Sequence, residues 1–377
     1  MQFIDLKAQQ ERIREGLKKS YEDILSHGRY IMGPEISKLE SELGSYIGSK
    51  HTLSCSSGTD ALSLALMALG VGVRDAVFTT AFSFFASAET IALLGATPVF
   101  TDIDEKTYNI DSERLRERIE KTIEEGKLTP KAIVTVSLFG LAADYDEIKK
   151  IADEFDLKII DDSAQSFGGI YKDRKACTLG DIGCTSFFPA KPLGCYGDGG
   201  AVFTEDEELF EIMKSLRVHG KGSDKYDNVR IGLNARMDTV QAGVLLEKLK
   251  IFDDELSKKQ EVAKRYGDHL SKYVEVPVVA NGYKSAWAQY TIKLKGLERE
   301  ELLAHLKKRG IPTAVYYVTP MPLLKAFEYL QPTAKDYPVA VNASKKVMSL
   351  PMHAYLTDDD FERIFGAFDD FYKGNNG

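Results

Sequence analysis

The alternation of short apolar runs with amphipathic stretches between residues 51 and 204 limits most strongly how this chain can fold. Apolar runs of this length between helical patterns are typical of strands buried in a parallel sheet. The predicted strands are 51–54, 76–79, 97–100, 132–136, 157–160, 184–188 and 201–204, and the helices between most of them are 59–69, 85–94, 112–124 and 145–155. This order predicts an α/β fold with a mostly parallel, doubly wound sheet that helices cover on both faces. Ligands bind such sheets at the carboxyl ends of the strands.

Long helices flank this region. The spacing of apolar residues predicts helices at 8–27 and 34–48, with Gly33 and Pro34 as the break between them, and a helix at about 237–272. Beyond it we expect strands at 286–293 and 313–318 and helices at 298–309, 337–347 and 358–370, which form a smaller α+β unit. A chain of 377 residues is long enough for two domains. We predict a large domain over 1–250 and a small C-terminal domain over 251–377.

Composition argues against several classes of function. The net charge of −8 does not suit a nucleic-acid partner. No apolar run approaches the roughly 20 residues of a membrane span, and the charged start of the chain does not resemble a signal peptide. The four cysteines include no CxxC pair, and the six histidines offer no metal-ligand spacing. We therefore expect a cytoplasmic protein with free thiols, no bound metal and no membrane partner.

A single lysine follows the predicted strand 184–188. Pro189 and Pro192 stop regular structure on either side of Lys191, and four glycines follow between Gly194 and Gly200. A lysine held at the end of a buried strand has a lowered pKa and can attack a carbonyl to form a Schiff base. The alternative is a surface lysine in a glycine-rich hairpin.

Two acids, Asp161 and Asp162, follow the apolar strand 157–160. One carboxylate at that strand end can face the ligand crevice, while its neighbour caps a helix or faces solvent. A buried carboxylate requires a cationic partner, and a protonated pyridine nitrogen would serve. The alternative for either acid is a plain helix cap.

Two further strand ends carry candidate ligand groups. The small hydroxyl residues and glycine of Ser54–Leu62 precede a helix, whose free N–H groups could bind a phosphate, although an ordinary N-cap has the same composition. An aromatic residue in the segment 81–87 could stack on a flat ring, but core packing is the commoner role of a phenylalanine. The chain has neither a Walker loop nor a GxGxxG motif. A phosphate cradle, an aromatic plate, a carboxylate and a lysine are together the groups needed to hold pyridoxal phosphate (PLP).

At this point the chain resembles the DegT-type PLP-dependent nucleotide-sugar aminotransferases of fold type I. The motifs that carry the resemblance are Ser57-Gly58-Thr59-Asp60-Ala61-Leu62, Asp162-Ser163-Ala164-Gln165, Ser186-Phe187 with Lys191, and Gly232-Leu233-Asn234-Ala235-Arg236-Met237-Asp238. It runs nearly end to end, from Phe3 to His353.

The resemblance implies that eight residues bind the cofactor: Gly58, Thr59, Phe84, Asp162, Gln165, Ser186, Lys191 and Asn234. Lys191 would form the internal aldimine and Asp162 would pair with the pyridine nitrogen, so both are catalytic. Gln165 would lie near the ring hydroxyl and Phe84 at the position of the stacking aromatic. Gly58, Thr59 and Ser186 would bind the phosphate. Asn234 would reach the phosphate in the opposite subunit, which implies a homodimer with shared active sites.

The resemblance also implies a reaction in which glutamate donates an amino group to a keto-sugar of a nucleoside diphosphate. The nearest branch acts on UDP-2-acetamido-2-deoxy-3-oxoglucuronate, for cell-surface polysaccharide such as lipopolysaccharide O-antigen. In that branch an arginine matching Arg236 and a His-Tyr pair matching Tyr316-Tyr317 hold the sugar. Because tyrosine replaces the histidine, other 3-oxo or 4-oxo sugars derived from dTDP-6-deoxyhexose or UDP-N-acetylglucosamine stay open. From a different class, a non-catalytic nucleotide-sugar-binding sensor is the alternative.

Overall fold

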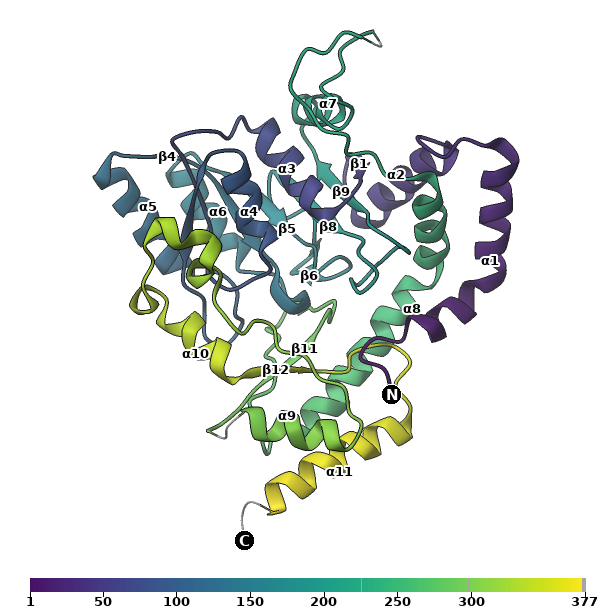
Figure 1. The fold of residues 1–377 in the computed structure, drawn as a ribbon, viewed down its shortest axis with the longest axis vertical. Helices are drawn as coiled ribbons and strands as arrows, with labels where there is room; N and C mark the ends of the chain where they lie inside the picture. Colours follow the sequence, from purple (N-terminus) through teal and green to yellow (C-terminus); the bar gives the residue numbers. More distant parts are fainter. Residues whose placement is uncertain (225, 297–298, 375–377) are drawn as a thin grey trace.

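A seven-stranded sheet forms the centre of the computed structural model, which describes residues 1–224, 226–296 and 299–374 (Figure 1). The strand order is β1-β9-β8-β5-β4-β2-β3. The bounds are β1 His51–Cys55, β2 Asp75–Thr80, β3 Thr97–Thr101, β4 Thr129–Val136, β5 Lys158–Asp162, β8 Ile182–Ser186 and β9 Gly200–Thr204. Neighbouring strands are parallel from β8 to β3, whereas β9 is antiparallel to both β1 and β8. The predicted mostly parallel sheet is confirmed, with all seven strands present.

Helices cover both faces of the sheet, as expected. Successive residues of one strand belong to different hydrophobic clusters: Ile160 faces the side with α3 (Gly58–Ala68), and Ile159 faces the side with α5 (Ser112–Glu125) and α6 (Tyr145–Glu154). Since neighbouring side chains of a strand point to opposite faces, this division requires cover on both sides. The remaining helices of this part are α4 (Ala86–Leu93), α7 (Glu207–Leu216) and the short η1 (Leu138–Gly140).

The long helix α8 (Thr239–Leu270) runs obliquely from the sheet to the lower part of the molecule (Figure 1). It packs against α1 (Leu6–His27) and α2 (Pro34–Ile47). Asp5 caps α1 by accepting the Ala8 N–H at 2.9 Å, and Gly28 ends it in the left-handed conformation. Because α8 continues without a break past residue 250, the boundary between residues 250 and 251 would fall inside a helix, and the two-domain division stays a prediction.

The C-terminal part has its own hydrophobic core, with α8, α9 (Arg299–Lys308) and α11 (Asp358–Gly374) around the antiparallel pair β11 and β12. β11 spans Tyr290–Lys293 and β12 Val347–Leu350. The other elements here are α10 (Pro338–Lys346) and the short helices η2 (Met321–Leu323), η3 (Lys325–Leu330) and η4 (Ala334–Asp336). Residue 298, the predicted start of α9, lies outside the described residues. The N-terminus joins this part, since Phe3 O accepts the Met352 N–H at 3.2 Å.

The predicted strand 313–318 is wrong. Only Ala314 bridges Ser349 of β12, and the chain then turns toward the large sheet. There the Tyr317 ring makes an edge contact with Phe82, with 5.8 Å between centroids. The β-branched and aromatic residues of 313–318 therefore pack against the large sheet and do not form a third strand beside β12. The predicted strand 286–293 is shorter, because Trp287 has φ +50° and the strand begins at Tyr290.

A small three-stranded sheet lies beside the large one. It consists of β6 (Ile170–Tyr171), β7 (Arg174–Lys175) and β10 (Tyr283–Lys284), in the order β10-β6-β7. β10 thus ties the chain after α8 to the segment that follows β5. In the part of the chain that the structure describes, no helix is both long and apolar enough to cross a membrane.

Candidate active site

Lys191 and Asp162 come from the carboxyl ends of two adjacent parallel strands. Asp162 is the last residue of β5 and pairs with Cys184 of β8. β8 ends at Ser186, two residues before the predicted end, and the chain turns so that the Lys191 N–H donates to Phe188 O at 2.8 Å. A Cβ on Gly194 would lie 2.6 Å from the same oxygen, so only glycine permits this tight return. The turn holds Lys191 over the strand ends.

Burial and charge perturb both groups. Desolvation lowers the pKa of Lys191, and the charge of Asp162 partly opposes this shift. Burial raises the pKa of Asp162, which is 5% exposed, while hydrogen bonds and Lys191 counteract the rise. Ser87 Oγ donates to its Oδ2 at 2.9 Å and the Ala164 N–H to its Oδ1 at 3.2 Å. No ion pair to Asp162 forms within the described chain, so this buried carboxylate can accept a cationic partner.

Asp161 neither caps a helix nor faces solvent, contrary to the expectation for the neighbour of Asp162. It is fully buried on the opposite face of β5. Its carboxylate accepts the Tyr145 hydroxyl at 2.6 Å, the Ser163 hydroxyl at 2.5 Å and the Cys177 N–H at 2.9 Å. Burial raises the pKa of Asp161 to about 6. Three hydrogen-bond donors therefore take the place of water around the Asp161 carboxylate, which suits a structural role.

The start of α3 and the end of β8 form a cradle. Ser57 caps the helix by accepting the Asp60 N–H at 3.0 Å, which leaves the N–H groups of Gly58 and Thr59 without a partner among the described residues. A Cβ on Gly58 would lie 2.6 Å from the Cβ of Ser186. The cradle thus combines two free N–H donors, a helix N-terminus and a serine hydroxyl, a combination that suits phosphate.

Gln165 is linked to the predicted substrate residue Tyr317. Its Oε1 accepts the Phe139 N–H at 2.8 Å, and its Nε2 donates to the Tyr317 hydroxyl at 3.2 Å. The Tyr316 ring lies 5.7 Å from that of Tyr317, centroid to centroid. The Phe84 side chain is 56% exposed, three residues before Ser87.

Asn234 and Arg236 lie in a separate segment. Arg236 donates from Nε and Nη2 to Asn234 Oδ1, at 3.0 and 2.5 Å. Between them, Ala235 O accepts the Ser56 N–H at 3.0 Å, beside the start of α3. Within one described chain neither side chain forms a hydrogen bond or ion pair with Lys191, Asp162, Gln165 or Tyr317.

Two residues of this network had no assigned role in the sequence reasoning. Ser87, on α4, reaches Asp162 from a segment that was considered only for its aromatic residues, and Phe139 fixes Gln165 from the turn after β4. The available signal for Ser87 is a hydroxyl residue at the start of a helix that follows a strand of the same sheet, β2. Phe139 contributes its backbone N–H, in a turn where its φ is +58°. Nothing in the sequence around Phe139 indicates this contact with Gln165, because a backbone group does not depend on the type of side chain.

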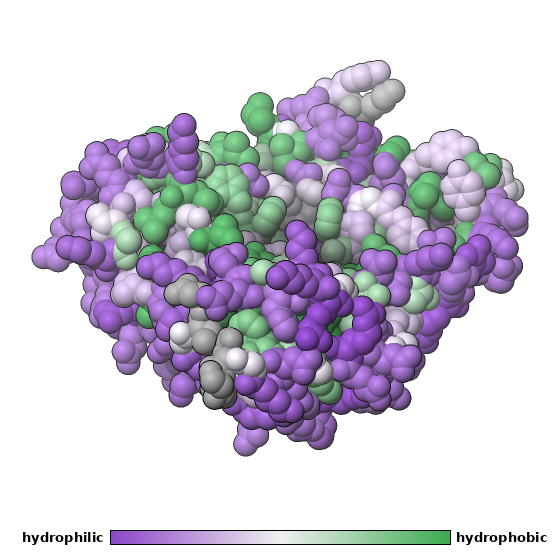
Figure 2. All heavy atoms as spheres, turned by 60° about the horizontal axis from the view of Figure 1, so that its bottom comes forward, coloured by the Kyte–Doolittle hydropathy of each residue, from purple (hydrophilic) through white to green (hydrophobic). Residues whose placement is uncertain are grey.

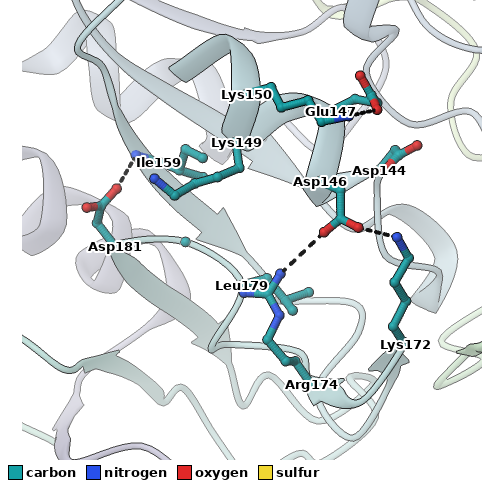
Figure 3. A pocket seen from close by; sticks show the side chains of 11 residues that line it. Asp144, Asp146, Glu147, Lys149, Lys150, Ile159, Lys172, Arg174, Leu179 and Asp181 are labelled. Atoms are coloured by element: carbon teal, nitrogen blue, oxygen red, sulfur yellow. Dashed lines mark hydrogen bonds and ion pairs between the residues drawn. The ribbon is translucent and has the colours of Figure 1, made fainter. Parts of the chain in front are cut away.

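A surface hollow of about 580 Å³ lies beside α6, away from these residues (Figure 3). None of its lining residues is a predicted site residue. Its charges pair with one another: Lys150 contacts Glu147 at 2.6 Å, and Asp146 contacts both Lys172 and Arg174. Since these cations are already paired, the hollow offers little to a charged ligand.

The chemistry of the strand-end residues fits PLP. Asp162 is a buried acid in need of a cation, Lys191 is an amine with a lowered pKa, and the cradle at Gly58 and Ser186 offers phosphate donors. A large, mostly parallel sheet with a lysine and an acid at its strand ends defines a fold-type I PLP enzyme.

The chain belongs to the DegT/DnrJ/EryC1/StrS aminotransferase family, whose model matches residues 11–369. It is a PLP-dependent sugar aminotransferase, and the predicted family, fold, reaction type and cofactor are confirmed.

The most informative relatives cover nearly the whole chain. The UDP-2-acetamido-2-deoxy-3-oxo-D-glucuronate aminotransferase of Pseudomonas aeruginosa is 46% identical over 97% of this chain and 99% of its own. A crystal structure of a family member from Brucella abortus is 47% identical, with a TM-score of 0.96 over 98% of this chain and 99% of that one. The PLP form of a sugar aminotransferase from Streptococcus pneumoniae is 26% identical, with a TM-score of 0.88 over 96% of this chain and 96% of that one.

Proposed function

We propose that this enzyme transfers the amino group of glutamate to the 3-oxo position of UDP-2-acetamido-2-deoxy-3-oxoglucuronate, for cell-surface polysaccharide such as lipopolysaccharide O-antigen. The observation that carries the catalytic assignment is the approach of the buried Asp162, at the end of β5, to Lys191, in the turn that follows the adjacent strand β8. The choice of sugar is supported by the name of the Pseudomonas relative. A sensor without catalysis is not favoured, because both reactive groups are present.

Each proposed role follows from a group on this chain. When bound, PLP supplies an electron sink for the carbanion at the α-carbon of the donor. Lys191 would hold its aldehyde carbon and, once released, carry a proton on Nζ to and from that α-carbon. Asp162, as a carboxylate, would keep the pyridine nitrogen protonated.

The other proposed cofactor contacts orient the ring and its phosphate. The N–H groups of Gly58 and Thr59 and the Ser186 hydroxyl would bind the phosphate, since they meet at one cradle. Phe84 would cover the ring face and Gln165 would donate to the ring hydroxyl. With Oδ1 of Asn234 held by Arg236, its Nδ2 is left to donate outward.

The sugar carboxylate would be bound by Arg236. A guanidinium suits a planar carboxylate, and Nη1 of Arg236 is not used by Asn234. Tyr316 and Tyr317 would contribute hydroxyl groups in place of the histidine-tyrosine pair. A tyrosine hydroxyl adds no positive charge, so of these three residues only Arg236 would supply a positive charge for the carboxylate.

A homodimer would complete the site. Tyr30, Ile31, Met32 and Tyr196 are between 37% and 51% exposed. They gather at the start of α8, where Tyr30 O accepts the Thr239 N–H and the Tyr196 N–H donates to Gln241. On the face drawn in Figure 2, apolar side chains lie in the middle and hydrophilic side chains line the lower rim. Asn234 lies shortly before the start of α8 in the sequence. Exposed apolar side chains near the start of α8 favour a second copy of this chain as the partner.

A cytoplasmic location is part of the same proposal. All four cysteines are free, buried thiols. Unpaired cysteines are typical of proteins from reducing compartments.

Absorbance of the purified enzyme tests the reaction. We expect a visible band from bound PLP that bleaches when glutamate is added and returns when the UDP-linked 3-oxoglucuronate is supplied. A panel of 3-oxo and 4-oxo sugars without the carboxylate provides the comparison. Faster recovery with one of those sugars would overturn the choice of substrate, and a band that glutamate leaves unchanged would overturn the donor.

A further inference from the structure

The hydrogen bonds of Gln165 restrict what it can offer to a ligand. This side chain is 3% exposed, and its Oε1 already accepts the Phe139 N–H at 2.8 Å. Its Nε2 donates one hydrogen to the Tyr317 hydroxyl at 3.2 Å. A carboxamide nitrogen has two hydrogens, so one N–H remains. The remaining N–H of Gln165 can therefore donate to a further group, in a direction that Phe139 and Tyr317 fix together.

Tyr317 is well placed to hold this orientation. Its ring makes edge contacts with Phe82 and Tyr316, at 5.8 and 5.7 Å between centroids, and these contacts hold the hydroxyl in position. Burial raises the pKa of Tyr317, with a smaller contribution from the charge of Asp162, so the hydroxyl stays neutral and close to the acid. Tyr317 follows Ala314, which is anchored on β12. The hydrogen bond between Gln165 and Tyr317 therefore links the C-terminal part of the chain to the segment just after β5.

We propose that Tyr317 is a positioning residue for Gln165: its hydroxyl turns the carboxamide so that the remaining N–H faces the ring oxygen of PLP. This inference rests on the proposed role of Gln165 and gives Tyr317 a role besides contact with the sugar. A donor at the ring oxygen favours the more negative, deprotonated form of the bound chromophore. Weakening that donor raises the pH at which the visible band changes.

The test is a pH titration of the visible absorbance of the holoenzyme. In Tyr317→Phe we expect the midpoint to move upward by roughly 0.5–1 pH unit, the size expected from one weakened hydrogen bond. Gln165→Leu should move it in the same direction by at least as much. The matched control is Tyr108→Phe. The Tyr108 ring packs against Phe82, as Tyr317 does, but its hydroxyl forms no hydrogen bond with Gln165, so the midpoint should not change.

The outcomes separate this inference from the proposed function. A Tyr317→Phe titration that superimposes on the wild type while Gln165→Leu is shifted would overturn it, as would a raised KM for the sugar with no spectral change. An unshifted Gln165→Leu would overturn it too, because Gln165 would not face the ring. A wild-type protein that binds PLP without any visible band would overturn the proposed function itself, and this inference with it.

Discussion

Asp162 forms no ion pair within the described chain, and Ser87 is the side chain that donates a hydrogen bond to it. The hydroxyl of Ser87, which is 1% exposed, lowers the pKa of an acid that burial raises. In its proposed role the acid must be ionised to hold a protonated ring nitrogen, so Ser87 would act indirectly on the chemistry. The positions of Asp162 and Lys191 after strands were predictable from the sequence. The approach of Ser87 to Asp162 depends on how α4 packs against α3, β2 and β3, which no local pattern reveals.

Removing that hydroxyl should weaken catalysis most at low pH. In Ser87→Ala the pKa of Asp162 rises further, so the carboxylate is lost at a higher pH as the pH falls. We expect kcat near pH 7 to fall about tenfold, as for loss of one buried hydrogen bond to a charged group, and the acidic limb of the pH–kcat profile to move upward. Ser87→Thr keeps the hydroxyl and is the control. An unmoved acidic limb in Ser87→Ala would contradict this account of Ser87.

The contact between α3 and β8 sets the width of the phosphate cradle. In Gly58→Ala the new Cβ would lie 2.6 Å from Ser186 Cβ, so the helix and the strand end must separate. We expect a stability loss of about 1–3 kcal/mol and at least a tenfold weaker PLP affinity, measured by denaturant unfolding and cofactor titration. Gly72→Ala is the control, because nothing lies within 4 Å of its Cβ position. Wild-type affinity in Gly58→Ala would show that the cradle does not bind the phosphate.

Helix α8 buries a charged amine that the proposed mechanism does not use. Lys248 is 1% exposed, its Nζ has no hydrogen-bond partner among the described residues, and it lies 4.4 Å from the centroid of the Tyr196 ring. Desolvation lowers its pKa from 10.5 to about 8. Between these values the unfolded chain binds the proton and the folded chain does not, so stability rises with pH across that window.

Lys248→Met should therefore be more stable than the wild type at pH 7, by about 2–3 kcal/mol, with the advantage shrinking toward pH 10. Urea unfolding at both pH values measures the difference. Lys250→Met, at an exposed position of the same helix, should change stability by less than about 0.5 kcal/mol. Destabilisation of Lys248→Met at pH 7 would mean that the contact of the ammonium with Tyr196 outweighs its desolvation.

Elements with strong periodicity were predictable from the sequence, and short ones were not. All seven sheet strands and α8 follow from apolar spacing. The run 313–318 has strand propensity, but contacts of Tyr317 with Phe82 and Gln165 take it toward the sheet. β12 was missed because Val347–Leu350 follows α10 without a turn signal.

At the scale of the whole molecule, Asn234 forms no hydrogen bond or ion pair with Lys191, Asp162, Gln165 or Tyr317 within one described chain. If Asn234 serves the opposite subunit, a heterodimer of Lys191→Ala and Asn234→Ala chains contains one intact site. Purified through two different tags, it should have about half the wild-type activity per dimer. A heterodimer no more active than the Asn234→Ala homodimer would place Asn234 in its own site. The pattern of strands in one sequence cannot predict that a residue of one subunit completes the site of the other.

The assignment of Lys191 as the residue that carries PLP is tested most directly by borohydride reduction of the purified holoenzyme, followed by mass spectrometry of its peptides. Reduction makes the link between an amine and the cofactor permanent. We predict that the mass of the reduced cofactor is found on the peptide containing Lys191 and that Lys191→Ala loses it. An unmodified Lys191 peptide, with the cofactor on another lysine or on none, would contradict the account.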